Sequence, residues 1–323
     1  SHESITSFGE KSGLCLEGGR IISTQPFYAY LKIAEGCDNC CTYCAIPSIR
    51  GRFRSRQIKD IAAEAKWLAD NGVTELVVVA QDTTRYGEDI YGKPSLAELL
   101  SELCRIDGIK WIRTLYAYPE RITPDLIDVI AKEKKLVKYL DIPLQHCNKE
   151  ILRRMNRHGD RESLKALINK IREKIPGITL RTTLITGFPG ETEDQFEELC
   201  EFVKEMRFDR LGCFAYSAEE GTPAAAMEDQ IPLKIRERRA EIIMEEQMFI
   251  SDSLNEQALG KTVEVVTEGY DRYAECWYGR SAADAPEIDG KIFFISDTKL
   301  CAGEYVNVHI DDTLDYDLIG TRV

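Results

Sequence analysis

The sequence predicts an α/β protein made of an open, partial β/α barrel of about six units, followed by a small antiparallel β-barrel. Between Phe27 and Tyr216, apolar runs typical of buried strands alternate with segments of helical periodicity. After about residue 259 the pattern changes to short strands separated by Gly and Asp turns. Repeated strand–helix units indicate parallel strands joined by right-handed crossovers. An open doubly wound sheet is the alternative arrangement of the same units.

The first predicted unit begins with a strand at 27–33, after which Gly36 turns the chain into a cysteine-rich loop. A helix at 58–69 ends at Asn71-Gly72, and the apolar strand at 76–80 follows. The later units have the same signals: helices at 96–106, 124–132, 148–155, 160–175 and 192–206, and strands at 111–116, 137–142, 178–185 and 211–216. Six units are two fewer than a complete barrel has, so we expect a partial barrel whose active face lies at the carboxyl ends of the strands.

Three segments are predicted along the chain. Residues 1–24 are polar and are interpreted as a leader or linker, 25–257 as the partial barrel, and 258–323 as the small β-barrel domain. Four strands are expected in the last segment, at 263–266, 273–278, 291–295 and 305–310. This segment has thirteen Asp and Glu residues against six Lys and Arg, a net charge of −7.

The composition is that of a soluble globular protein, with 43% hydrophobic and 30% charged residues. No apolar run approaches the ~18 residues that cross a bilayer, and no signal peptide pattern is present, so we expect a cytoplasmic protein with no membrane partner. The net charge of −13 argues against broad attraction to nucleic acid phosphates. Most cysteines are scattered through apolar stretches, which is typical of reduced thiols and not of a disulfide framework.

Four of the eleven cysteines fall between Cys37 and Cys44. Cys37, Cys41 and Cys44 have the spacing Cys-x3-Cys-x2-Cys, with Cys40 inside the first gap. Three thiolates can bind three irons of a [4Fe-4S] cluster and leave the fourth iron open to a small molecule. A structural zinc site and a buried cysteine-rich turn are the alternatives, although zinc sites more often use two separated Cys-x2-Cys pairs.

This loop, with Tyr43 before its last cysteine, resembles the signature of the radical S-adenosylmethionine (SAM) superfamily. Further segments resemble its methylthiotransferase branch, and in particular the enzymes that modify an aspartate of a ribosomal protein. These segments are Gly36–Pro47, Arg50–Arg56, Val79–Gly87, Leu115–Pro119, Asp141–His146 and Gly187–Thr192. The C-terminal barrel resembles the TRAM domain of these enzymes, so the resemblance covers about residues 25–323.

The resemblance implies a radical SAM type barrel with a [4Fe-4S] cluster on Cys37, Cys41 and Cys44, SAM as second cofactor, and no catalytic side chain beyond the cluster ligands. The implied reaction inserts a methylthio group at the β-carbon of an aspartate in the twelfth protein of the small ribosomal subunit. A flavodoxin- or ferredoxin-like electron donor is expected, and a monomer. Methylthiolation of adenosine in tRNA is the alternative, but an acidic TRAM domain favours a basic ribosomal protein. A zinc-stabilised binding protein without catalysis is the alternative from another class.

Five residues are predicted to contact SAM: Tyr43, Gln81, Asp82, Thr183 and Arg154. The resemblance places the strand end at Gln81 and Asp82 beside the amino group of SAM, and Thr183 beside its ribose. Arg153, Arg154 and Arg157 flank Met155 on a predicted helix, and one of them, taken here as Arg154, is expected to pair with the SAM carboxylate. Each residue also has an ordinary structural explanation, such as a polar strand end or a solvated basic helix face.

Two further features remain open. The four arginines at alternate positions from Arg50 to Arg56 either act beside the cluster loop or pair with acids within the fold, and His146 is expected to have a structural role. The methylthiotransferases that the chain resembles carry an N-terminal domain whose three cysteines hold a second [4Fe-4S] cluster, whereas only Cys15 precedes Cys37 here. We therefore predict a truncated form that cleaves SAM but transfers little or no sulfur.

Overall fold

The computed structural model describes residues 18–323, so most of the predicted leader at 1–24 lies outside the described residues. Its larger unit is a six-stranded sheet in the order β1-β4-β5-β6-β7-β8, with every neighbouring pair parallel. The strands are β1 (Tyr28–Lys32), β4 (Glu75–Val79), β5 (Trp111–Thr114), β6 (Leu136–Asp141), β7 (Thr179–Thr186) and β8 (Arg210–Ala215). Because the strands follow one another in chain order and β1 does not pair with β8, the sheet is an open partial barrel. A doubly wound sheet would reverse its order, so that alternative is wrong.

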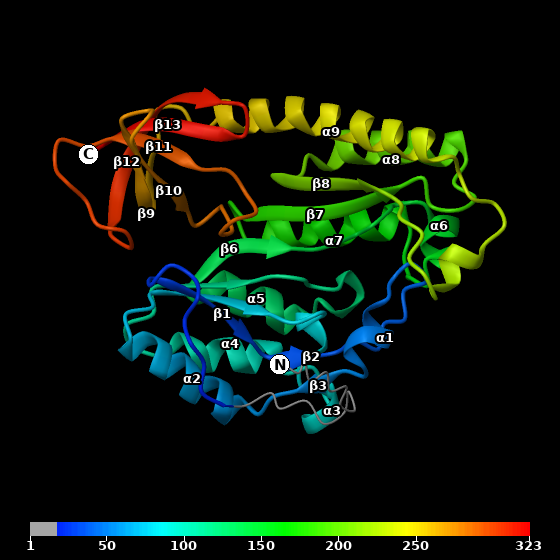
Figure 1. Ribbon diagram of the computed structural model, residues 1–323, viewed down its shortest axis with the longest axis horizontal. Coiled ribbons are helices and arrows are strands. Elements are labelled where there is room, and N and C mark those ends of the chain that lie inside the picture. Colours follow the sequence, from blue (N-terminus) through cyan, green and yellow to red (C-terminus); the bar gives the residue numbers. More distant parts are fainter. Residues whose placement is uncertain (1–17) are drawn as a thin grey trace, which may run out of the picture.

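Helices cover the outer side of this sheet (Figure 1). The longer ones are α2 (Ile58–Asp70), α4 (Leu96–Cys104), α5 (Pro124–Lys132), α7 (Arg161–Lys174), α8 (Glu193–Met206) and α9 (Leu233–Glu256). Alternate strand residues, such as Leu31, Val78 and Leu140, are buried against these helices. Thr123 caps α5, and Thr192 forms a capping box at the start of α8, so two predicted helix starts are confirmed.

Short elements surround the cysteine loop. They are β2 (Ala34–Glu35), which pairs with β3 (Arg54–Ser55), the helices α1 (Ile46–Arg50), α3 (Glu88–Tyr91) and α6 (Lys149–Arg154), and 3₁₀ turns at Thr83–Arg85, Pro119–Arg121 and Pro223–Ala226. Figure 1 shows α1, β2 and β3 at one end of the sheet and the C-terminal barrel at the other. The cysteine loop therefore lies at the carboxyl ends of the strands, as predicted.

The C-terminal unit is a closed five-stranded barrel in the order β10-β11-β13-β12-β9. Its strands are β9 (Thr262–Asp271), β10 (Cys276–Ser281), β11 (Ile292–Ile295), β12 (Tyr305–Leu314) and β13 (Asp317–Arg322). The small β-barrel is confirmed, but its composition differs from the prediction in two respects. A fifth strand, β13, was not predicted, and it pairs parallel to β11, so the barrel is not purely antiparallel.

The inner side of the partial barrel is unusually polar toward the amino-terminal ends of its strands. Glu75, Arg113 and Tyr139 point inward and are almost completely buried. Arg113 pairs with Glu75 at 3.2 Å, and Arg280 from β10 pairs with the other oxygen of the same carboxylate. The loop between β10 and β11 completes this closure, because Arg113 also donates to the carbonyl of Ala282 at 2.9 Å. The C-terminal barrel thus seals the end of the sheet that lies opposite the cysteine loop.

Candidate functional site

The backbone at the start of the cysteine loop requires glycine. Gly36 has φ +82°, and a Cβ atom on it would lie 2.1 Å from the carbonyl oxygen of Arg52. The next amide, that of Cys37, donates to the carbonyl of Gly51 at 3.2 Å. These contacts hold the first cysteine against the segment that leads into β3.

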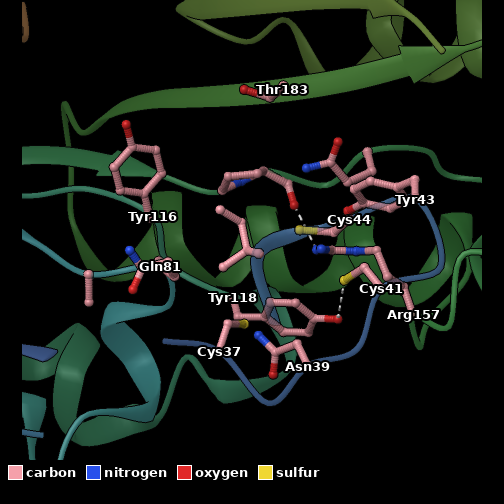
Figure 2. A pocket seen from close by; sticks show the side chains of 15 residues that line it. Cys37, Asn39, Cys41, Tyr43, Cys44, Gln81, Tyr116, Tyr118, Arg157 and Thr183 are labelled. Carbon is pink, nitrogen blue, oxygen red and sulfur yellow. Dashed lines mark hydrogen bonds between the residues drawn. The ribbon is translucent and has the colours of Figure 1, made fainter. Parts of the chain in front are cut away.

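Three of the four clustered cysteines line one cavity of about 460 Å³ (Figure 2). Cys37, Cys41 and Cys44 line it, whereas Cys40 is exposed and does not. The opposite walls come from the carboxyl ends of four neighbouring strands, through Gln81 after β4, Tyr116 and Tyr118 after β5, Gln145 after β6, and Thr183 in β7. A cavity of this size suits a cofactor or small substrate.

The chain beyond α6 holds the cysteine loop in place. Asn156 donates from its side-chain amide to the carbonyl oxygens of Asn39 and Cys40, at 3.3 and 3.0 Å. Thr42 donates through its backbone amide to Met155, at 3.0 Å, and through its hydroxyl to the carbonyl of Arg154, at 2.8 Å. Both Asn156 and Cys40 have positive φ, at 58° and 51°. Left-handed backbone at non-glycine residues often marks functional sites, where surrounding contacts fix it.

Partial burial favours the protonated form of two of the cavity thiols, Cys37 and Cys44. Burial raises the pKa of Cys37 to about 11, against the opposing effect of the backbone amide of Asn39. Burial likewise raises the pKa of Cys44, while the amide of Ile46 opposes the rise. Metal binding requires the thiolate and drives its deprotonation, so these thiols act as ligands only when the metal replaces the protons.

The arrangement differs from that of a single-ion site. Among residues 18–323, no three His, Cys, Asp or Glu side chains converge as ligands of one metal ion. In a [4Fe-4S] cluster each cysteine binds a different iron, so the three sulfurs surround a cluster instead of one ion.

One positive charge lies in the wall of this cavity. Arg157 is almost fully buried, stacks over the Tyr118 ring at 4.2 Å from its centroid, and donates to the carbonyl of Pro143 at 2.7 Å. Tyr118 in turn places its hydroxyl 3.9 Å from Sγ of Cys41. Figure 2 shows the Arg157 guanidinium beside the cavity-lining cysteines. Because arginine stays protonated, this side chain offers a fixed cation to an anionic group in the cavity.

Two cavity-lining amides have buried oxygen atoms that find no hydrogen-bond partner among residues 18–323. They are Oε1 of Gln81, which follows β4, and Oε1 of Gln145, which follows β6. A buried acceptor without a donor is costly, so both oxygens fit a ligand that brings N–H or O–H groups.

The predicted site residues fall into two groups. Tyr43, Gln81 and Thr183 line the cavity together with the three cysteines, whereas Asp82 and Arg154 lie outside its lining. Asp82 is fully buried and supports the wall indirectly. It accepts from Asn39 at 2.8 Å and from Thr84 at 2.6 Å, and the Thr84 hydroxyl accepts from the Tyr118 amide at 3.1 Å.

Arg154 pairs with Asp229 at 2.7 Å instead of pointing into the cavity. It is the last residue of α6, and Asn156 then reverses the chain direction in left-handed conformation. This reversal carries Arg157, three positions later, into the cavity wall. Arg153 lies on the outer face of α6 and pairs with Glu150.

Three of the four alternating arginines pair with acids among the described residues, and Arg54 donates instead to the carbonyl of Arg52 at 3.0 Å. Arg50 lies 3.8 Å from Glu35, Arg52 3.7 Å from Asp38, and Arg56 2.6 Å from Glu64. The first two pairs are partly exposed and contribute little to stability, whereas Arg56 is buried. This pairing agrees with the structural alternative stated for these residues.

The loop Gly187–Thr192 is organised by a buried carboxylate. Glu191 accepts from the Gly187 amide at 2.9 Å and from Arg239 of α9 at 2.7 Å. His146 lies 3.6 Å from the same carboxylate, and its Nδ1 accepts from the amides of Cys147 and Asn148. These contacts agree with the structural role expected for His146.

Four polar or aromatic residues that line the cavity had no predicted side-chain role: Asn39, Tyr116, Tyr118 and Gln145. The last three lie in the segments Leu115–Pro119 and Asp141–His146, which the sequence analysis identified only as resembling known enzymes. The signal for these three was position, since each lies at the end of a predicted strand on the active face or within three residues after it.

Comparison with known proteins identifies the family. The family model of the radical SAM superfamily matches residues 31–203, and that of the TRAM domain matches residues 259–323. The chain belongs to the radical SAM superfamily. It is 51% identical over 319 residues to the ribosomal protein uS12 methylthiotransferase RimO of Clostridium tetani, a match that covers 97% of this chain and 71% of the relative. The protein of the same name from Thermoanaerobacter sp. is 48% identical over 319 residues, covering 98% and 72%.

At this level of identity the chain is a member of the methylthiotransferase family, and the alternative of a zinc-stabilised protein without catalysis is wrong. A solved structure supports the fold alone. The radical SAM methyltransferase TsrM from Kitasatospora setae, solved with cobalamin and a [4Fe-4S] cluster, matches with a TM-score of 0.50 and 16% identity, over 61% of this chain and 36% of that one.

The superfamily uses a [4Fe-4S] cluster and SAM, and the cavity fits both groups. Three thiols face one side of it, Arg157 supplies a cation, and the Gln81 and Gln145 oxygens supply acceptors without partners. The thiols complement the irons of the cluster, Arg157 complements the carboxylate of SAM, and the amide oxygens complement its ammonium group.

Proposed function

We propose that this protein inserts a methylthio group at the β-carbon of an aspartate in ribosomal protein uS12. The observation that carries the proposal is the convergence of three cysteines, one buried arginine and two unpaired amide oxygens on one cavity at the carboxyl ends of the strands. When bound, the reduced cluster and SAM supply hydrogen abstraction from an unactivated carbon, which acid or base side chains cannot perform.

The chain's own residues position and shield the reactants. Cys37, Cys41 and Cys44 hold the cluster, and we propose that Arg157, instead of Arg154, pairs with the SAM carboxylate. Gln81 accepts from the SAM ammonium group, and the aromatic walls keep water and competing hydrogen donors away. Tyr43 and Thr183 are proposed as further contacts, because both line the same cavity.

The proposed choice of uS12 over tRNA rests on charge. Exposed acids on the C-terminal barrel include Asp311, Asp312 and Asp315 around the β12–β13 hairpin. This surface repels phosphates and attracts a basic ribosomal protein. The barrel lies at the opposite end of the sheet from the cavity, so its charge acts on approach and not on the reacting atoms.

The first test examines SAM cleavage. After anaerobic reconstitution, the protein should bind about four irons on the cavity cysteines. It should then form 5′-deoxyadenosine from SAM with a chemical reductant or a flavodoxin- or ferredoxin-like donor. Bound zinc with no SAM cleavage would overturn the proposed chemistry.

The second test examines the substrate. The reconstituted enzyme is incubated with SAM, reductant and sulfide, and with either small ribosomal subunits or tRNA, and products are read by mass spectrometry. A methylthio group on a uS12 aspartate is expected, and modification of tRNA alone would overturn the choice of substrate. We further propose that the uS12 product in this assay is small relative to the 5′-deoxyadenosine formed, because the cavity cysteines of the described residues account for a single cluster.

A further inference from the structure

Tyr116 forms part of the cavity wall in a backbone conformation that needs support. It has φ +60°, which costs a non-glycine residue about 1–2 kcal/mol. Three hydrogen bonds hold its peptide groups. Its amide donates to Oδ2 of Asp141 at 3.0 Å, and its carbonyl accepts from the amide and the hydroxyl of Thr83, at 3.1 and 3.2 Å. The position of Tyr116 in the wall therefore depends on the Asp141 carboxylate, at the end of β6.

Asp141 is held in turn by Arg181, from the neighbouring strand β7. Nη1 of Arg181 donates to Oδ1 of Asp141 at 3.0 Å and lies 3.5 Å from the hydroxyl of Thr183, another residue of the cavity wall. Burial raises the pKa of Asp141, and Arg181 opposes that rise by favouring the ionised form. The ionised form is the one that accepts from both Arg181 and Tyr116.

The other side of Arg181 faces the C-terminal barrel domain. Nε of Arg181 lies 3.5 Å from Oδ1 of Asp289, in the loop between β10 and β11. Oδ2 of Asp289 accepts from the hydroxyl of Tyr139 at 2.7 Å and from the amide of Ala285 at 2.8 Å. Asp289 is therefore fixed by its own loop and by β6, and it presents its second oxygen to Arg181.

We propose that Asp289, Arg181 and Asp141 form a positioning chain through which the C-terminal domain fixes Tyr116 in the wall of the SAM cavity. The chain runs inside the partial barrel, where the side chains of Asp141 and Asp289 are 1% and 3% exposed and that of Arg181 is 16% exposed. Water competes little for these contacts, so the loss of one charge should also weaken the hydrogen bonds of the next group in the chain. The domain thereby contributes to cofactor binding without touching the cofactor. Figure 2 shows Tyr116 and Thr183 on the wall that faces the cysteines.

The variant Asp289→Asn tests this chain selectively. The substituting Asn side chain has one amide oxygen, which can still accept from Tyr139 and Ala285. Its NH₂ group then faces Arg181, so two donors meet and the ion pair is lost. The matched control is Asp284→Asn in the same loop. Asp284 pairs with Arg210 at 2.6 Å and accepts from Ser281, but it has no contact with Arg181 or Asp141.

The first readout is hydrogen exchange at the Tyr116 amide, measured by mass spectrometry on peptides that span residues 115–118 of the protein without cofactors. Asp289→Asn should speed this exchange about fivefold, whereas Asp284→Asn should leave it unchanged even if it lowers the melting temperature. Equal acceleration in both variants would show general loosening of the domain contact and would overturn the proposal, as would no acceleration in Asp289→Asn.

The second readout is SAM affinity of the reconstituted protein, measured by equilibrium dialysis. It rests on the proposed function, since it requires that the cavity take SAM. Asp289→Asn should raise Kd about fivefold relative to the wild type and to Asp284→Asn. Faster exchange with unchanged Kd would overturn the link to cofactor binding. If the wild type itself fails to bind SAM, the proposed function fails, and the exchange measurement still decides whether the positioning chain exists.

Discussion

Replacement of Glu75 by Gln should destabilise the contact between the two domains strongly. The Glu75 carboxylate is fully buried and pairs with two arginines, Arg113 of β5 and Arg280 of β10. Arg280 keeps a second partner, Glu268, at 2.8 Å. Among the described residues, Arg113 would then be a buried cation without a counter-charge, held by the carbonyl of Ala282, the face of the Tyr139 ring and the uncharged amide that replaces the carboxylate. Removing one partner of a buried ion pair typically costs about 3–5 kcal/mol, and we expect a loss in this range.

The matched control is Glu264→Gln, which removes an ion pair across the same domain contact at the surface. Glu264 pairs with Lys110 at 2.8 Å, and the two side chains are 44% and 40% exposed. An exposed pair contributes about 0.2–1 kcal/mol, so this variant should remain close to the wild type. Unfolding in guanidinium chloride, followed by circular dichroism, gives the free energy of each protein. If Glu75→Gln loses less than about 1 kcal/mol, or no more than Glu264→Gln, the ionic contact does not hold the domains together as argued.

Three further predictions concern the cavity and its surroundings. Serine in place of any one of the three cavity-lining cysteines should abolish cluster binding, whereas Cys40→Ser should keep the full iron content, which a colorimetric iron assay measures. Arg157→Lys should weaken SAM binding about tenfold in equilibrium dialysis because the planar pairing group is lost, whereas Arg154→Lys should not; equal effects would contradict the assignment. Burial raises the pKa of the Asp209 carboxyl above its ordinary value of 3.8. The contribution of this carboxyl to the free energy of unfolding is therefore complete below pH 3.8, and it is lost as the pH rises through the folded-state pKa. The difference in unfolding free energy between the wild type and Asp209→Asn should therefore decrease over that range, and a constant difference would contradict it.

The larger domain could be predicted well because its signals are local. The strands are apolar runs that end at turn residues, and the helices have recognisable capping residues. The six strand–helix units could therefore be predicted without tertiary information. The barrel strand β13 (Asp317–Arg322) lacked such a signal. Gly320 interrupts its short apolar run, and the reason for that glycine is tertiary, since a Cβ there would lie 2.2 Å from the carbonyl oxygen of His309 on β12.

The site could be predicted where spacing or strand position determines it. Cys37, Cys41 and Cys44 follow from spacing, and Gln81 and Thr183 from their positions at the carboxyl ends of strands. The prediction of Arg154 assumed that Arg153, Arg154 and Arg157 lie on one helix around Met155. Helical periodicity cannot show that α6 ends at Arg154 and that Asn156, with φ +58°, then redirects the chain.

The charged interior of the partial barrel was the feature least accessible to sequence analysis. Arg113 and Arg181 alternate with apolar residues along their strands, a pattern that normally indicates a face toward water. Arg113 donates to the carbonyl of Ala282 and Arg181 pairs with Asp289, and both partners lie more than a hundred residues later in a different domain, so no local signal joins them. In the folded protein, the charged side chains of the two domains pair and close the amino-terminal end of the partial barrel. The proposed cofactor cavity lies at the carboxyl-terminal end, and a substrate side chain must therefore reach the cysteine loop from that end, whichever surface first attracts the substrate protein.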